Sequence, residues 1–139
     1  MSFSDLAVGA TVFTVTFPVE RADLVAYADA SGDHNPIHQD EAAAKAAGLP
    51  NVIAHGMYTM GLVSRAVVEW AAGTGIDATL TDFSARFAKP VVVPAEGGAA
   101  IVVEGKVRKL EGDTVELTMT VTSAGEKVLA PARATLAAK

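Results

Sequence analysis

The spacing of apolar and polar positions divides the chain into a helix-rich first half and a strand-rich second half. Residues 11–17 alternate with period two in β-branched and aromatic side chains, which predicts a strand that Pro18 ends. Four later stretches have strand-like composition, at 79–87, 99–110, 114–123 and 127–136. Only short turns separate the last three stretches, so we expect hairpins in an antiparallel sheet.

Three segments have apolar residues at helical spacing. Residues 20–30 and 41–47 predict two short helices, the second one capped by Asp40 and stopped by Gly48. Residues 56–72 predict the longest helix. Charged residues are rare in this helix, which is typical of a helix that is buried on most sides.

One long buried helix and five antiparallel strands indicate an α+β architecture in which the sheet wraps around the helix. The chain has 139 residues and shows no repeat, linker or low-complexity tract, so we expect a single domain over 1–139. Half of the residues are apolar and few are aromatic. The core must therefore consist mainly of Val, Leu, Ala and Met.

Composition excludes several classes of function. The net charge of −5 argues against a nucleic-acid binder, which needs a basic surface, but a local Arg and Lys cluster can still bind an anionic ligand. The absence of cysteine excludes disulfides, thiolate nucleophiles and thiolate-bound zinc, and fits a reducing compartment. Residues 1–5 do not resemble a signal peptide, and no apolar stretch approaches the ~20 residues of a membrane helix. We therefore expect a cytoplasmic protein without membrane insertion.

The first chemically informative stretch is the loop 31–38, which Pro36 stiffens. Asp33 and His38 lie five residues apart, so a turn can bring both side chains to one water molecule. Histidine titrates near neutral pH and can take and return a proton, while a carboxylate holds the water. Asn35 precedes a proline, which favours extended backbone, and it can brace the loop. The same turn-forming residues also occur in ordinary loops, and a single histidine is commonly structural.

The second informative stretch, 53–57, lies where the long helix is expected to begin. The first amides of a helix have no partners within it, and the helix dipole favours negative charge there. Gly56 allows a ligand to approach this bare backbone, which suits the enolate oxygen of an activated thioester. His55 at the same helix start is more often a structural than a catalytic residue.

A metal site is the weakest interpretation of the polar residues. It would use His34, His38, His55 and Asp33, but no pair of them has the spacing of a known metal motif. The chain also lacks a nucleophile elbow and a glycine-rich phosphate loop. We therefore expect no metal and no cofactor.

Three motifs together resemble those of the MaoC-like hydratases. Tyr-Ala-Asp-Ala-Ser-Gly-Asp-His-Asn-Pro-Ile-His at 27–38 is similar to the hydratase signature of the family. Ile-Ala-His-Gly-Met at 53–57 resembles the start of its central helix, and Phe-Ser-Ala-Arg-Phe-Ala-Lys-Pro-Val at 83–91 resembles its Arg-Phe strand. The order and spacing of all three agree, and they span most of the chain.

The resemblance implies the hot-dog fold and the reversible hydration of trans-2-enoyl thioesters to (R)-3-hydroxyacyl thioesters. By motif position, Asp33 and His38 would activate the water, the Gly56 amide would bind the thioester oxygen, and Asn35 would support the loop. The family implies no cofactor. It implies a homodimer that joins two sheets, with an acyl-CoA or an acyl carrier protein thioester as substrate.

Further details resemble the catalytic subunit of the mycobacterial type II dehydratase, in which case a second hot-dog subunit would form a heterodimer with this chain. Arg86, Lys89 and His55 are candidate substrate-binding residues, although surface charges are usually only solvated. Two residues depart from the family pattern. Pro131 in the last strand predicts an edge position or a bulge. Pro94 follows the Arg-Phe strand where a glycine is more common, which puts the local shape of the sheet in doubt.

The residues leave three alternatives open. An acyl-CoA thioesterase on the same fold also needs a carboxylate and a water, but it attacks C1 of the substrate. A non-catalytic hot-dog subunit would bind acyl chains and support a partner, although the intact set of Asp33, Asn35 and His38 argues against it. A hydratase for a small non-lipid thioester would have the same loop. Chain length, carrier, direction and pathway do not follow from the sequence.

Overall fold

The computed structural model describes residues 1–139, in which one antiparallel sheet of five strands packs against a long helix. The strands follow the order β1-β3-β4-β5-β2 across the sheet, so β1 and β2 form its two edges. Their bounds are β1 Thr11–Val19, β2 Ala78–Phe87, β3 Ala99–Glu111, β4 Thr114–Ser123 and β5 Glu126–Ala138. The expected α+β architecture and the two late hairpins are confirmed.

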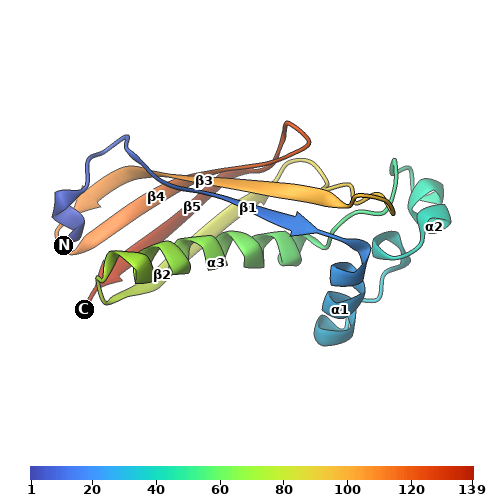
Figure 1. Ribbon diagram of the computed structural model, residues 1–139, viewed down its shortest axis with the longest axis horizontal. Helices are drawn as coiled ribbons and strands as arrows, with labels where there is room; N and C mark the ends of the chain where they lie inside the picture. Colours follow the sequence, from blue (N-terminus) through green and yellow to red (C-terminus); the bar gives the residue numbers. More distant parts are fainter.

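The long helix α3, Gly56–Thr74, lies along one face of the sheet (Figure 1). The short helices α1, Arg21–Ser31, and α2, Glu41–Ala46, lie beyond the N-terminal end of α3, while both chain termini lie near its C-terminal end (Figure 1). Short 3-10 turns occur at Phe3–Asp5 and Pro36–His38. None of the helices combines the length and the hydropathy needed to cross a membrane.

The core lies between α3 and the sheet. Alternate residues of the three central strands point into it, and valine is its commonest residue. From α3 it receives one stripe of side chains at helical spacing: Thr59, Val63, Ala66, Val67 and Ala71. The expected Val, Leu and Ala core is confirmed, whereas methionine contributes little to it.

Helix α3 is buried along one face only, so the expectation of a helix buried on most sides is wrong for the single chain. Met57 and Val68 lie on the opposite face and are 60% and 49% exposed. The two charged residues of the helix, Arg65 and Glu69, also lie exposed on this outer face, where they pair with each other.

The positions of Pro18 and Pro131 in the strands differ in part from what the sequence predicted. Strand β1 continues through Pro18 to Val19, because β1 is an edge strand and an edge tolerates a missing N–H. Pro131 does not lie at an edge, since β5 pairs with both β4 and β2. The alternative, a bulge, is confirmed: the register skips Ala130 and Pro131 on both sides of β5, between Ala132 and Leu129. Pro94 lies in the connection between β2 and β3, outside the strands.

Candidate active site

Three segments meet at the N-terminal end of α3: the loop after α1, residues 52–55 before α3, and residues 87–91 after β2. Backbone hydrogen bonds hold them together. The Ala54 amide donates to the Val91 carbonyl at 2.9 Å, and the Ile53 amide donates to the Ile37 carbonyl at 3.2 Å. Irregular segments thus gain defined positions from one another, which a functional site on loops requires.

The loop that carries Asp33 is built from successive side chain to backbone turns. Gly32 ends α1 with a φ of 80°, the left-handed conformation that glycine adopts readily. The Asn35 amide donates to Asp33 Oδ1, and the Ile37 amide donates to Asn35 Oδ1, both at 3.2 Å. Asn35 therefore caps the turn that carries His38, and Asp33 Oδ2 has no hydrogen bond within the protein.

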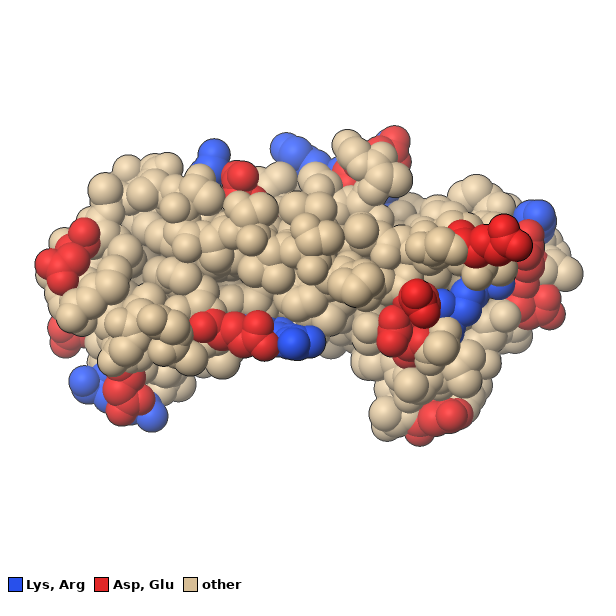
Figure 2. Space-filling model, viewed as in Figure 1, with Lys and Arg blue, Asp and Glu red and all other residues tan.

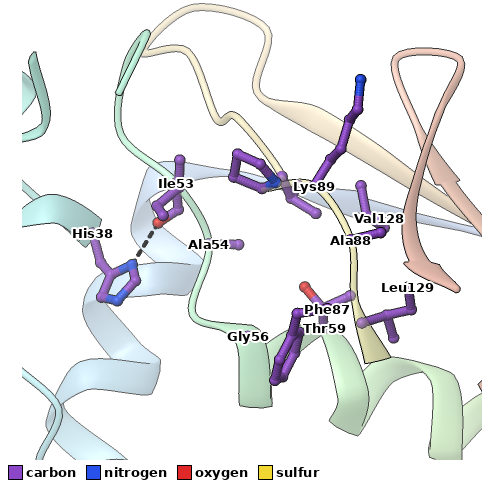
Figure 3. A pocket seen from close by; sticks show the side chains of 12 residues that line it. His38, Ile53, Ala54, Gly56, Thr59, Phe87, Ala88, Lys89, Val128 and Leu129 are labelled. Carbon is purple, nitrogen blue, oxygen red and sulfur yellow. Dashed lines mark hydrogen bonds between the residues drawn. The ribbon is translucent and has the colours of Figure 1, made fainter. Parts of the chain in front are cut away.

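The ring of His38 is buried and oriented by a backbone carbonyl. Its Nδ1 lies 2.7 Å from the Ile53 carbonyl oxygen (Figure 3). A carbonyl only accepts hydrogen bonds, so Nδ1 must carry the proton. The neutral ring then has a bare Nε2, which is the nitrogen that can accept a proton from a bound molecule.

His55 lies directly behind this ring. The two imidazoles stack with centroids 3.8 Å apart and planes at 24°. His55 Nε2 lies 3.0 Å from the Asp33 carbonyl oxygen, and the side chain is only 2% exposed. His55 is absent from the cavity wall described below, so its surroundings are those of a support for Asp33 and His38.

The free end of α3 points its first amides toward the same place. No side chain caps this end, and Gly56 is its first residue. A Cβ atom on Gly56 would come within 2.7 Å of Cε1 of Phe87, so the glycine is needed for the contact with this ring. The helix dipole adds partial positive charge at these amides.

A cavity of about 310 Å³ opens beside His38 and Gly56, a size within the range of small-ligand pockets (Figure 3). Most of its wall is apolar. The lining residues are His38, Ile53, Ala54, Gly56, Thr59, Phe87, Ala88, Lys89, Pro90, Val91, Val128 and Leu129. The bulge at Ala130 and Pro131 follows the wall residue Leu129 directly in β5.

Two prominent wall residues were not among the candidates from the sequence. Thr59 follows Gly56 by three residues and so shares its helix face, a signal that the spacing did contain. Phe87 belongs to the Arg-Phe motif, but its 58% exposed ring reaches Gly56 only because the end of β2 lies beside α3. That contact depends on tertiary structure and has no local signal.

The structure brings together some of the expected site residues and separates others. Asp33 is exposed and lies outside the cavity wall, but it offers a ligand atom within 4.8 Å of both His38 and His55. Lys89 lines the cavity, with its Nζ 3.2 Å from Glu126 and directed away from the pocket interior (Figure 3). Arg86 is exposed and does not line the cavity.

The cluster of Asp33, His38 and His55 has residue types that can bind a metal ion. Its geometry does not suit one. A metal binds along the lone pair in the plane of each imidazole, at about 2.0 Å from the nitrogen. Rings that stack at 3.8 Å with a 24° tilt direct their lone pairs nearly side by side, so these do not converge on one point. His34 is outside the cluster.

Two tyrosines complete the surroundings. Tyr27 packs against His55 with centroids 4.8 Å apart, and its other neighbour is Tyr58 at 5.4 Å in an edge-on arrangement. Burial raises the pKa of the Tyr58 hydroxyl, and the carboxylate of Asp23 adds to the increase, whereas Arg65 opposes it. Tyr27 thus lies between His55 and Tyr58 in a chain of ring contacts behind the loop that carries Asp33.

Charged side chains lie mainly at the margins of the face shown in Figure 2, and much of its middle is uncharged. The surface is hollowed between the long body of the molecule and the lobe that contains α1 (Figures 1 and 2). The outer surface of α3 exposes the apolar residues Met57 and Val68 together with the ion pair of Arg65 and Glu69. The exposed apolar side chains are suited to contact with another apolar surface.

Comparison with known proteins finds similar sequences and similar structures. The family model of the MaoC like domain matches residues 5–125 of this chain. The 3-hydroxyacyl-thioester dehydratase X of Mycobacterium tuberculosis is 45% identical over 90 residues, which are 63% of this chain and 29% of that protein. The chain thus corresponds to less than a third of the length of this relative.

Two solved structures are similar over nearly the whole chain. A MaoC-like dehydratase superposes with a TM-score of 0.91 at 38% identity, covering 99% of this chain and 42% of the other. An R-hydratase from Pseudomonas aeruginosa superposes with a TM-score of 0.81 at 30% identity, covering 99% and 84%. These similarities confirm the expected hot-dog fold.

Proposed function

This chain belongs to the family of MaoC-like domains, and we propose that it catalyses the reversible hydration of trans-2-enoyl thioesters to (R)-3-hydroxyacyl thioesters. The observation that carries the proposal is the bare Nε2 of His38, which lies beside Asp33 and at the wall of an apolar cavity. The family's dehydratase and R-hydratase relatives have the matching chemistry in their names.

In the proposed mechanism, Asp33 and His38 hold one water molecule. His38 Nε2 takes a proton from this water while the water oxygen forms a bond to C3 of the substrate. The electron pair of the C2–C3 double bond moves toward the thioester carbonyl and gives an enolate. The pair of Asp33 and His38 then delivers a proton to C2 on the same face, so the protein regains its starting state and one water has been added.

The enolate oxygen is placed at the Gly56 amide, where the uncapped end of α3 supplies both a donor and a favourable dipole. A single donor of this kind contributes roughly a hundred- to thousandfold in rate. The apolar wall of the cavity excludes water from the rest of the substrate and strengthens this hydrogen bond.

We further propose that the chain forms one hot-dog domain over its 139 residues and acts as a dimer, either with a second copy or with another hot-dog subunit. The unpaired edge of β2 and the exposed apolar residues of α3 support this proposal, since both are surfaces that a partner would cover. The substrate is carried by CoA or by acyl carrier protein, with Lys89, and more remotely Arg86, near its phosphates.

The test is incubation with crotonyl-CoA, following the absorbance of the conjugated thioester in parallel with the release of free thiol. The proposal predicts that the absorbance falls without thiol release and that the product is (R)-3-hydroxybutyryl-CoA. Thiol release would instead indicate a thioesterase. Silence in both assays, repeated with longer acyl chains and with carrier-bound substrates, would contradict the proposal for this chain alone.

A further inference from the structure

Only two buried side-chain nitrogen or oxygen atoms of this protein lack a hydrogen-bond partner, and these are Nδ1 of His55 and Nε of Arg133. The first lies directly behind the candidate catalytic pair. His55 contacts both members of that pair, one through a hydrogen bond and the other through its ring. No other side chain makes a hydrogen bond or a ring stack with both Asp33 and His38, which distinguishes His55 from the remaining residues around the loop.

We propose that His55 is a positioning residue, which acts as a neutral ring protonated on Nε2 and holds Asp33 and His38 in the relative position that the reaction needs. This inference rests on the proposed hydratase function for its kinetic consequence. Its structural part, the protonation of the two rings, stands independently of which reaction the protein catalyses.

The hydrogen bond to Asp33 determines which nitrogen of His55 is protonated. Nε2 lies 3.0 Å from the Asp33 carbonyl oxygen, which can only accept, so Nε2 is the donor. Nδ1 then has no proton in the neutral ring. It is buried and has no partner, so a second proton there would be a buried charge without an acceptor. The contacts of His55 therefore fit a ring that carries its proton on Nε2.

The stack determines the orientation of His38. Its ring is held on one edge by the Ile53 carbonyl at 2.7 Å and on one face by His55 at 3.8 Å. His55 in turn is packed against Tyr27, whose ring lies 4.8 Å away. A carbonyl alone leaves a ring free to swing about the hydrogen bond, whereas the stacked face prevents this rotation and keeps Nε2 directed toward the water.

The two contacts also explain why a histidine is needed at this position. An aliphatic residue would fill the space but would leave the Asp33 carbonyl without its donor. A glutamine can supply a donor but has no ring, and a phenylalanine has a ring but no donor. Only an aromatic ring with an N–H satisfies both, and histidine has the smallest such ring.

The test compares His55→Gln and His55→Phe with the unchanged protein, measuring kcat and KM for crotonyl-CoA. Each variant keeps one of the two contacts. We expect kcat to fall about 10- to 100-fold in both, because small displacements of catalytic groups have effects of this size, while KM changes about twofold or less. Val52→Ala is the matched control, since Val52 is fully buried in the same segment but takes no part in the stack.

A second readout separates positioning from a purely structural role. Nitrogen-15 NMR of the imidazole rings reports which nitrogen carries the proton, and the chain has only three histidines to assign. In the unchanged protein we expect His38 protonated on Nδ1 and His55 on Nε2. In His55→Gln and His55→Phe we expect His38 to show a mixture of both tautomers, whereas Val52→Ala leaves it unchanged.

The inference is overturned if His55 in the unchanged protein is protonated on Nδ1 or on both nitrogens at neutral pH. It is also overturned if the kcat of both His55 variants falls no further than that of Val52→Ala while His38 keeps one tautomer. Because the NMR experiment needs no turnover, it decides the inference even if the protein proves not to hydrate enoyl thioesters. The NMR spectrum of the unchanged protein also decides the inference if a His55 variant fails to fold.

Discussion

The two ends of α3 are built from different interactions. At the N-terminal end, Asp33, His38 and His55 are held by backbone amides and carbonyls, and a cavity opens beside them. At the C-terminal end, Trp70 stacks on Phe3 and packs against the tilted ring of Phe13, with ring centroids 6.3 Å apart in each pair. Gly56 at one end and Trp70 at the other are 14 residues apart (70 − 56), which is about 21 Å along the helix axis.

The difference shows how one helix serves both stability and chemistry. Aromatic packing at the C-terminal end removes apolar surface from water. At the N-terminal end, each polar side chain uses one atom for support and keeps another free, as His38 does with Nδ1 and Nε2. Stability and activity are therefore expected to respond to different substitutions.

The largest expected effect is at the catalytic pair. Asp33→Asn and His38→Gln should each lower the hydration rate by about 10³-fold, the size typical of a lost general acid or base. Asp33→Asn keeps an oxygen that can accept the hydrogen bond from the Asn35 backbone amide, and His38→Gln loses one hydrogen bond. The free energy of unfolding should therefore change by only about 1 kcal/mol. Steady-state kinetics and denaturant unfolding measure both. Near-normal rates in either variant would refute the assigned roles.

The reverse effect is expected at the C-terminal end of the helix. Trp70→Ala removes the ring between Phe3 and Phe13 and should lower the free energy of unfolding by about 3 kcal/mol, while kcat per folded molecule stays the same. Denaturant unfolding gives the free energy of unfolding, and the rate divided by the fraction of active sites gives kcat per folded molecule. Glu69→Gln is the control on the same helix, since its pair with Arg65 is exposed to solvent and such pairs contribute little to stability. A comparable loss of kcat would mean that the two ends are coupled.

A smaller effect separates support of the loop from support of the fold. Asn35→Ala removes the cap of the turn that carries His38, at a cost of about 1 kcal/mol. Asp40→Ala removes an equivalent cap from α2, where the Ala42 amide lies 3.0 Å from Asp40 Oδ1. We expect similar shifts of Tm in the two variants, but a lower kcat only for Asn35→Ala. Equal activities would show that the loop does not need this cap.

The smallest effect concerns pH. Burial raises the pKa of Tyr58, so the folded chain binds this proton more tightly than the unfolded chain. The resulting stability is fully present below about pH 10, the unfolded pKa, and is lost as the pH rises through the folded value. Tyr58→Phe should therefore lose less stability between about pH 8 and about pH 11 than the unchanged protein does. Parallel curves would exclude Tyr58 as the source.

Much of the fold was predictable from local patterns, because alternating strands and a long apolar helix have clear periods. The expectation that α3 is buried on most sides was wrong, and the expectations for the prolines failed in part because they depend on the order of strands. Pro18 did not end its strand because β1 is at an edge, and Pro131 lies inside the sheet because β5 pairs on both sides. Strand order follows from packing of the whole chain, and no local pattern contains it.

The candidate site shows the same division. Asp33, Asn35, His38 and Gly56 were identified from short motifs with a chemical reason, and the structure places them at one end of α3. The stack of His55 on His38 and the contact of Phe87 with Gly56 join segments that are distant in sequence. Their roles depend on three-dimensional contacts, so residue type and spacing alone could not assign them.

The central claim is that Asp33 and His38 add water from one face of an enoyl thioester. It is tested most directly by hydration of crotonyl-CoA in deuterated water, with the product analysed by NMR and chiral chromatography. The account predicts a 3R hydroxyl and a single deuterium at C2 on the same face as that hydroxyl. A racemic product, or deuterium on the opposite face, would contradict it.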